Sequence, residues 1–249
     1  MRIIISPAKK MNVDRDRLSC SALPPFVDRA EELRDCLQAM SDEELKALWN
    51  SSDRIAEQNV QRLERMDLHH GLTPAILAYE GIQYQYMAPG VFSREELDYV
   101  QEHLRILSGF YGVLRPFDGV APYRLEMQAR LNIRGAEGLY GYWGSAIADA
   151  LYSETDCVVN LASQEYSRCV TRHLRPGRRF LTCVFGEEKG GKVIEKGTLC
   201  KMARGEMVRF MAERHIVEPE ELKGFDRLNY RFDPERSEED TYVFLRKYK

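Results

Sequence analysis

Apolar residues recur at helical spacing near the N-terminus of the chain, with charged residues between them. Residues 27–40 show this pattern, which predicts an amphipathic helix. The capping box Ser41-Asp-Glu-Glu44 predicts the start of a second helix, and residues 53–66 predict a third. Because the outer faces of these helices are strongly charged, we expect them to cover the core.

Short apolar runs elsewhere predict buried strands. Residues 2–5 contain three consecutive β-branched isoleucines, and residues 157–162 form a second apolar run. Residues 230–232 and 242–245 are shorter candidates. A polar glycine turn, EEKGG, lies between two further runs and predicts a β-hairpin. The two strands expected for that hairpin are residues 179–185 and 192–196.

Two further segments are assigned from their length, one to a strand and one to a helix. Residues 74–79 begin like a helix at Thr73-Pro74, but their short apolar run before Gly81 favours a strand. Residues 198–215 predict a long helix, on which Lys201 and Arg204 lie one turn apart and share a face.

A second capping box, Ser93-Arg-Glu-Glu96, predicts a helix that runs to about Ser108, with Gly109 as its C-terminal cap. A further helix is expected to begin at a cap formed by Ser145. The aromatic segment LYGYWG precedes that cap, and its rings either plug the core or stack on bases.

These elements predict a mixed α/β (α+β) fold, with a central mixed sheet surrounded by helices. The 249 residues suit a single compact domain, 1–249, because the sequence contains no repeat and no flexible linker. No apolar run approaches the roughly 20 residues that span a bilayer, and the N-terminus does not resemble a signal peptide. We therefore expect a cytoplasmic protein with no membrane partner; the oligomeric state stays open.

The cysteines and histidines do not indicate a metal or a cofactor. The six cysteines form no CxxC pair, so we expect reduced thiols that are buried or partly buried. The five histidines are scattered, and His69 and His70 are neighbours rather than partners on one helix face. We expect no metal site and no cofactor, and common nucleotide-binding and hydrolase motifs are absent from the sequence.

Charge is distributed unevenly along the chain. The net charge of −3 and the pI of about 6.0 are not typical of a nucleic-acid-binding protein. Residues 168–179, however, contain five arginines, among them Arg168 and Arg172, and no acid. An acidic protein can therefore still present a basic face, whereas the acidic helices at 28–67 would repel DNA.

Residues 105–127 combine bulky apolar side chains with glycines and prolines that interrupt regular structure. A buried, irregular segment needs partners for its backbone groups, and Arg115, Arg124 and Glu126 are candidates. Pro122 favours an extended start, so Arg124 and Glu126 should face one side of the segment. They form either a structural ion pair or part of a preformed anion site.

Polar residues also follow the predicted strands. Asn160, Ser163 and Tyr166 lie at or beyond the end of strand 157–162, where ligands gather in open α/β sheets, although a plain strand-to-helix turn is equally compatible. Lys9 and Lys10 follow the first strand, in a loop that contacts either solvent or an anion.

Several segments, in the same order, resemble the YaaA peroxide-stress family. They are IISPAKKM at 4–11, LSGFYGVLRPFDGVAPYRLEM at 107–127, LYGYWG at 139–144, VVNLASQEY at 158–166 and KMARGEMVRF at 201–210. The resemblance implies a bacterial, cytoplasmic protein that limits iron- and peroxide-dependent damage and binds DNA. It also implies a helix-hairpin-helix-like element and a positively charged cleft.

The glycines of the turn Gly109-Phe-Tyr-Gly112 are three apart, so the sequence alone supports such a hairpin weakly, and the resemblance favours it. Tyr86 and Asn229 stand where the family more often has glycine.

Two hypotheses follow. The first is a DNA-binding stress protein that contacts phosphates of duplex or branched DNA. The second is an enzyme that acts on a nucleotide-like or other anionic small molecule at the strand ends, although no catalytic residue is assigned. The candidate DNA- or anion-binding residues are Lys9, Lys10, Gly109, Gly112, Arg115, Tyr123, Arg124, Glu126, Asn160, Ser163, Tyr166, Arg168, Arg172, Lys201 and Arg204.

Overall fold

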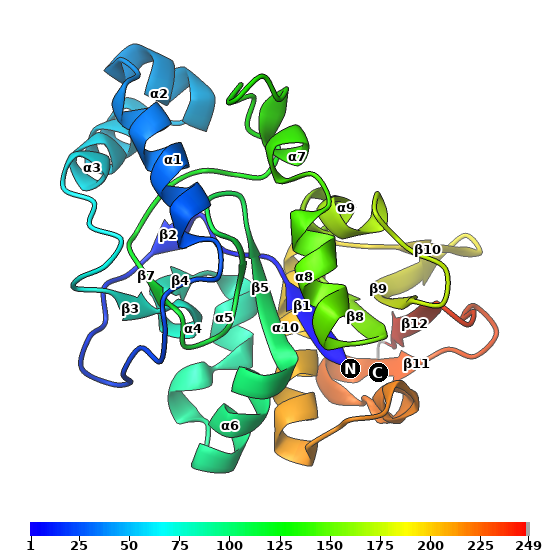
Figure 1. Cartoon of the computed structure of the whole chain (residues 1–249). Helices are drawn as coiled ribbons and strands as arrows, with labels where there is room; N and C mark the ends of the chain where they lie inside the picture. The colour runs from blue at the N-terminus through cyan, green and yellow to red at the C-terminus, as the bar shows by residue number, and fades with distance from the viewer. Residues whose placement is uncertain (248–249) are drawn as a thin grey trace.

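Five parallel strands form the centre of the structure, a computed structural model that describes residues 1–247 (Figure 1). In chain order they are β1 (Arg2–Ile5), β5 (Leu104–Ser108), β8 (Cys157–Leu161), β9 (Arg179–Lys189) and β12 (Thr241–Arg246). Their order across the sheet is β12-β9-β8-β1-β5, and each neighbouring pair is parallel. Ile3, Ile4 and Ile5 of β1 are fully buried, as their β-branched run predicts.

Antiparallel strands complete the sheet and make it mixed, as predicted. The strand β6 (Gly112–Leu114) pairs with β5 at one edge, and β11 (Tyr230–Phe232) pairs with β12 at the other. The predicted hairpin is confirmed, because β10 (Lys192–Ile194) pairs with the far end of β9.

The strand order creates a switch point at the centre of the sheet. The second parallel strand in the chain, β5, lies on one side of β1, and the third, β8, lies on the other. The connections that leave the carboxyl ends of β1 and β8 therefore diverge, which opens a crevice where doubly wound sheets bind ligands.

Helices cover both faces of the sheet (Figure 1). In that view α8 (Ala146–Glu154) and α9 (Gln164–Thr171) lie in front of the sheet, and α10 (Gly197–Arg214) lies behind it. The helix α10 packs closely on α5 (Ile82–Met87) and also contacts α6 (Arg94–His103).

The three N-terminal helices are confirmed with nearly the predicted bounds. They are α1 (Val27–Gln38), α2 (Asp42–Trp49) and α3 (Asp53–Glu64), and they lie together beside the sheet (Figure 1). The capping box at Ser41 is present, with Ser41 Oγ accepting from the Glu44 N–H and the Glu44 carboxylate accepting from the Ser41 N–H.

The prediction of a strand at residues 74–79 is wrong. This segment forms the short helix α4 (Ala75–Ala78) between two two-residue strands, β3 (Thr73–Pro74) and β4 (Tyr79–Glu80). Those strands pair with β7 (Gly119–Val120) and β2 (Lys10–Met11), so long-range pairing fixes both ends of the segment and leaves one helical turn between them.

The predicted helix from Ser93 is also too long. Its capping box is confirmed, but α6 ends at His103 and residues 104–108 form β5 instead of a last helical turn. All five residues of β5 are buried, and the strand is paired on both edges, with β1 and with β6. This tertiary pairing outweighs the local helical pattern.

Gly109 is consequently not a helix cap. Gly109 and Gly112 bound a tight turn between β5 and β6, and Gly112 has φ +72°, a conformation that glycine adopts without strain. The expected helix-hairpin-helix-like element is not found in this segment, because strands flank the turn on both sides.

The remaining short elements connect these layers. They are α7 (Gly138–Trp143) and three 3₁₀ helices, Pro89–Val91, Pro219–Gly224 and Arg227–Asn229. Ser145 precedes α8, but its hydroxyl donates to the Asp149 carboxylate rather than capping a backbone N–H. Asn229 has φ +65°, so it occupies a left-handed conformation that glycine or asparagine tolerates.

Two chain-wide expectations can be compared with residues 1–247. All six cysteines are free, as expected, although Cys20 is exposed rather than buried. Among the described helices, none combines the length and the apolar character that crossing a membrane requires.

Candidate functional site

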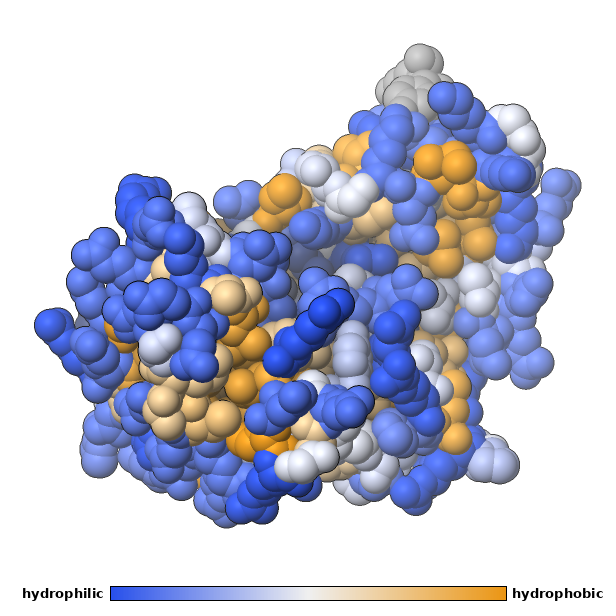
Figure 2. All heavy atoms as spheres, turned by 90° about the horizontal axis from the view of Figure 1, so that it is seen from above, coloured by the Kyte–Doolittle hydropathy of each residue, from blue (hydrophilic) through white to orange (hydrophobic). Residues whose placement is uncertain are grey.

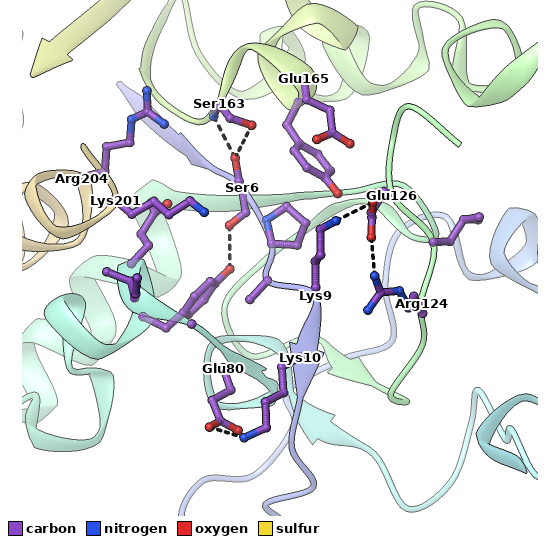
Figure 3. Close-up of a pocket in the computed structure, with 18 of the residues that line it drawn as sticks. Ser6, Lys9, Lys10, Glu80, Arg124, Glu126, Ser163, Glu165, Lys201 and Arg204 are labelled. Atoms are coloured by element: carbon purple, nitrogen blue, oxygen red, sulfur yellow. Dashed lines mark hydrogen bonds and ion pairs between the residues drawn. The ribbon is translucent and has the colours of Figure 1, made fainter. Parts of the chain in front are cut away.

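A pocket of about 410 Å³ lies at the carboxyl ends of β1 and β8, in the crevice created by the strand order (Figure 3). Seen from above, the molecular surface is hollowed at its centre and mainly hydrophilic around the hollow (Figure 2). The lining comes from five parts of the chain, which are residues 6–10, 80–84 and 123–126, the start of α9 and the first half of α10. The lining residues are Ser6, Pro7, Ala8, Lys9, Lys10, Glu80, Gly81, Ile82, Gln83, Tyr84, Tyr123, Arg124, Leu125, Glu126, Ser163, Glu165, Tyr166, Lys201 and Arg204.

Two serines join the strand ends. The backbone N–H of Ser163 donates to Ser6 Oγ at 2.8 Å, and the Ser6 hydroxyl donates to Ser163 Oγ at 3.2 Å. The Tyr84 hydroxyl donates to the Ser6 carbonyl oxygen at 3.0 Å. These bonds fix the end of β1 to the start of α9 and to α5.

A carboxylate holds two cations on the opposite wall. Glu126 Oε2 lies 2.9 Å from Lys9 Nζ, and Glu126 Oε1 lies 3.2 Å from Arg124 Nη2 (Figure 3). Arg124 and Glu126 therefore share one side of their segment, as the sequence predicts. A second pair, Lys10 Nζ to Glu80 Oε1 at 2.6 Å, lies lower in the same view.

The helix α10 brings two more cations. Lys201 is exposed, and its ammonium end points toward Ser6 (Figure 3). Arg204 is largely covered, with 16% of its side chain exposed, and its Nη2 lies 3.6 Å from Glu195 Oε2. Lys201 makes no ion pair with any residue of the range 1–247.

Three polar nitrogens of the lining are buried without a hydrogen-bond acceptor in the described part of the chain. They are Gln83 Nε2, Arg124 Nε and Arg204 Nε. An unmade hydrogen bond of a buried donor costs free energy, about 1–3 kcal/mol per group. A ligand rich in acceptor oxygens would remove this cost.

Hydroxyl groups and a carboxyl complete the pocket. The Tyr123 hydroxyl hydrogen-bonds both Tyr79 and Ser108, at 2.9 and 2.7 Å, and burial raises the pKa of Tyr123 to about 12. Burial, reinforced by the nearby Glu126 charge, raises the pKa of Glu165 above its ordinary value. The tyrosine therefore stays neutral, and Glu165 takes up a proton more readily than a solvated carboxyl.

The structure brings most of the predicted site residues together in this one pocket. They are Lys9, Lys10, Tyr123, Arg124, Glu126, Ser163, Tyr166, Lys201 and Arg204. They come from segments far apart in the sequence, and the fold gathers them because β1, β8 and α10 meet at the switch point.

The other predicted residues lie elsewhere. Gly109 and Gly112 are in the buried turn between β5 and β6. Arg115 Nη2 lies 3.5 Å from Glu154 Oε1, at a separate small cavity. Asn160 is buried within β8, where its side-chain oxygen accepts from the backbone N–H of Ala162.

Arg168 lies on α9 and Arg172 is the C-cap residue of that helix. Their guanidinium groups lie 6.0 and 5.0 Å from the Tyr140 ring centre. The Tyr140 hydroxyl donates to a backbone carbonyl, and the buried Trp143 donates its indole N–H to Gly109. These two rings are therefore structural, as the core-plug alternative predicts.

Five lining residues with polar side chains were not among the predicted site residues: Ser6, Glu80, Gln83, Tyr84 and Glu165. Ser6 could have been found, because it follows a buried strand just as Ser163 does. The other polar groups at 80–84 could not, because they reach the pocket through the pairing of β4 with β2 and the packing of α5 on α10.

Relatives of this chain are similar over nearly its whole length. A family model described as peroxide stress protein YaaA matches residues 1–236. A UPF0246 protein of Agathobacter rectalis is 53% identical over 247 residues, which is 99% of each chain. UPF0246 proteins of Desulfitobacterium hafniense and Lactiplantibacillus plantarum are 51% and 47% identical, over 99% and 98% of this chain and 98% and 99% of theirs. The matched region contains every residue of the pocket.

Proposed function

Because the chain belongs to the family of peroxide stress protein YaaA, we propose that it limits peroxide damage by binding DNA through the pocket at the strand ends. One observation carries this proposal, which is the convergence of cationic side chains from separate segments on one pocket. Those side chains are Lys9, Lys10, Arg124, Lys201 and Arg204.

The charges of the pocket suit phosphate. Lysine and arginine neutralise DNA phosphates and release counterions, so they supply affinity without reading sequence. Glu126 and Glu80 hold Arg124 and the two lysines in place, which lowers the cost of ordering these side chains when a phosphate arrives. The net charge of the chain is −3, so attraction to DNA depends on this local cluster.

Salt dependence of DNA affinity tests the proposal. The logarithm of affinity for duplex DNA should fall with the logarithm of salt concentration, with a slope of about −0.9 per phosphate contact. The double variant Lys9→Gln/Lys10→Gln should bind more weakly and reduce the steepness of this slope by up to about 1.8. Fluorescence anisotropy with a labelled duplex measures both quantities.

A matched control removes the same charge elsewhere. Lys189 and Lys192 are exposed residues of the β9–β10 hairpin, outside the pocket. The variant Lys189→Gln/Lys192→Gln should keep the wild-type affinity and slope. Equal losses in the two double variants, or a flat salt dependence in the wild type, would overturn DNA binding through the pocket.

A second candidate function has its own supporting observation. The pocket is small, it contains three carboxylates, and the buried Gln83 Nε2 has no acceptor within residues 1–247. These features suit an enzyme that acts on a nucleotide-like or other anionic small molecule. Conversion of a deoxynucleoside monophosphate by the purified protein, absent in Glu165→Gln, would favour this function over DNA binding.

A further inference from the structure

We propose that one end of the pocket is a subsite for a terminal phosphate group, a phosphomonoester carried by a DNA strand end or by a free nucleotide. Five residues form it: Ser6, Gln83, Ser163, Lys201 and Arg204. The inference rests on the proposed function and makes it more specific, because it names the chemical group that enters the pocket.

The start of α9 supplies the first part of the subsite. Ser163 is the N-cap residue of this eight-residue helix, yet its side chain caps no backbone N–H of the first turn. The Ser163 hydroxyl instead accepts a hydrogen bond from the Ser6 hydroxyl, and its own proton has no acceptor among residues 1–247. An oxyanion at this helix start meets free donors and the positive end of the helix dipole.

Gln83 supplies an independent indication of a ligand. Its side chain lines the same pocket, the residue is only 7% exposed, and its Nε2 finds no hydrogen-bond acceptor in the described residues. The helices α5 and α10 pack so closely that a Cβ at Gly205 would lie 2.2 Å from the backbone carbonyl oxygen of Gln83. This packing holds Gln83 in the pocket lining. The lining of the pocket thus contains a buried donor for which the described residues provide no acceptor.

The positive charge of the subsite comes from the helix α10. Lys201 and Arg204 lie one turn apart on α10, and in Figure 3 both are on the Ser6–Ser163 side of the pocket. Arg204 pairs with Glu195 through Nη2, which leaves its buried Nε without an acceptor in the range 1–247. Lys201, which makes no ion pair within residues 1–247, would supply one positive charge to the anion, and Arg204 would add a charge that Glu195 already shares.

Size and charge favour a terminal phosphate over an internal one. A phosphomonoester carries close to two negative charges at neutral pH, because its second pKa is about 6, whereas a phosphodiester carries one. The pocket, at about 410 Å³, has the volume of a small-molecule site. A chain end or a single nucleotide can enter such a site, but an internal phosphate of a duplex brings nucleotides on both sides.

The test compares oligonucleotide ends. Short duplexes of identical sequence carrying phosphate or hydroxyl at their 5′ and 3′ ends are bound to the full-length protein at fixed salt. A phosphate end should bind about tenfold more tightly than a hydroxyl end, as expected for charge-assisted hydrogen bonds. Deoxyadenosine monophosphate should compete, and deoxyadenosine should not.

Two variants separate the subsite from folding. Lys201→Gln, at an exposed residue, should remove the preference for phosphate, while Lys192→Gln should preserve it. Gln83→Leu should reduce the preference without lowering the melting temperature, because it deletes an unpaired buried donor.

The outcomes distinguish the two proposals. Salt-dependent binding with equal affinity for phosphate and hydroxyl ends, and no competition by the monophosphate, overturns the subsite and leaves DNA binding intact. Competition by the monophosphate without a preference among duplex ends supports the subsite and identifies a free nucleotide as its occupant. Failure of every duplex to bind at low salt overturns the proposed function itself.

Discussion

At the scale of single residues, Glu126 is the carboxylate on which one wall of the pocket depends. It accepts ion pairs from Lys9 and Arg124, and its side chain is only 19% exposed. Removing the partner of a buried carboxylate typically lowers the free energy of unfolding by about 3–5 kcal/mol. If Arg124 is removed, however, Lys9 remains paired with Glu126. The Arg124–Glu126 ion pair can therefore contact a ligand without being essential for folding.

Replacing Arg124 by alanine tests this reading. We expect Arg124→Ala to lower the free energy of unfolding by less than about 3 kcal/mol, because Lys9 still pairs with Glu126. DNA affinity should fall by about 1.5–3 kcal/mol, the usual worth of a hydrogen bond to a charged group. Thermal melting and anisotropy on the same sample measure both; a collapsed melting temperature would show that the pair is mainly structural.

Asp118 is the buried carboxylate whose ionisation should affect stability most. The residue is 1% exposed, its Oδ2 accepts from the Arg115 N–H at 2.8 Å, and its Oδ1 has no hydrogen-bond donor among residues 1–247. Burial raises the pKa of Asp118 from 3.8 to about 6, although the neighbouring Arg115 charge lowers it in part.

The sign of the pH effect follows from this raised pKa. The folded state binds the proton more tightly than the unfolded state, so the contribution is fully present below pH 3.8 and is lost as the pH rises through about 6. The variant Asp118→Asn keeps an acceptor for the Arg115 N–H and cannot ionise. Relative to this variant, the wild type should lose up to about 3 kcal/mol between pH 4 and 7. Urea unfolding at several pH values measures the difference, and a difference that stays constant would refute the assignment.

At the scale of elements, the contact between α5 and α10 shapes the pocket. A Cβ at Gly205 would lie 2.2 Å from the Gln83 carbonyl oxygen, closer than any real contact. We expect Gly205→Ala to separate the two helices, to destabilise the protein by about 1–3 kcal/mol and to weaken DNA binding. At Gly197, on the same helix, an added Cβ meets nothing within 4 Å. Gly197→Ala should therefore be neutral or stabilising, and equal melting temperatures in the two variants would argue against close packing.

The sequence predicts correctly those elements that are specified by a few neighbouring residues. The capping boxes at Ser41 and Ser93 and the isoleucines of β1 are examples. The local patterns of residues 74–79 and 104–108 predict the wrong conformation, because pairing with distant strands decides it. A short apolar run has no periodicity of its own that could distinguish these outcomes.

At the scale of the whole molecule, the strand order could not be read from the sequence, and it determines where the site lies. The sequence predicted that Arg124 and Glu126 share a side, because that depends only on the alternation of an extended chain. The sequence marks Lys9, Ser163 and Lys201 as candidate site residues, but their meeting in one pocket depends on β1 and β8 being neighbours and on α10 packing behind them.

The thiols give little support to direct chemistry with peroxide. Burial raises the pKa of every cysteine of the chain, so the reactive thiolate is scarce at neutral pH. The proposed function accordingly assigns no role to a reactive cysteine.

The most direct measurement of the central claim is DNA breakage in peroxide-treated bacteria that lack the native gene and carry one of three versions of it. The versions are the wild type, the pocket variant Lys9→Gln/Lys10→Gln and the hairpin variant Lys189→Gln/Lys192→Gln, each at equal protein abundance. The account predicts that the wild type and the hairpin variant suppress strand breaks equally, while the pocket variant leaves breaks near the level of the empty strain. Full suppression of breaks by a pocket variant that no longer binds DNA in vitro would contradict it.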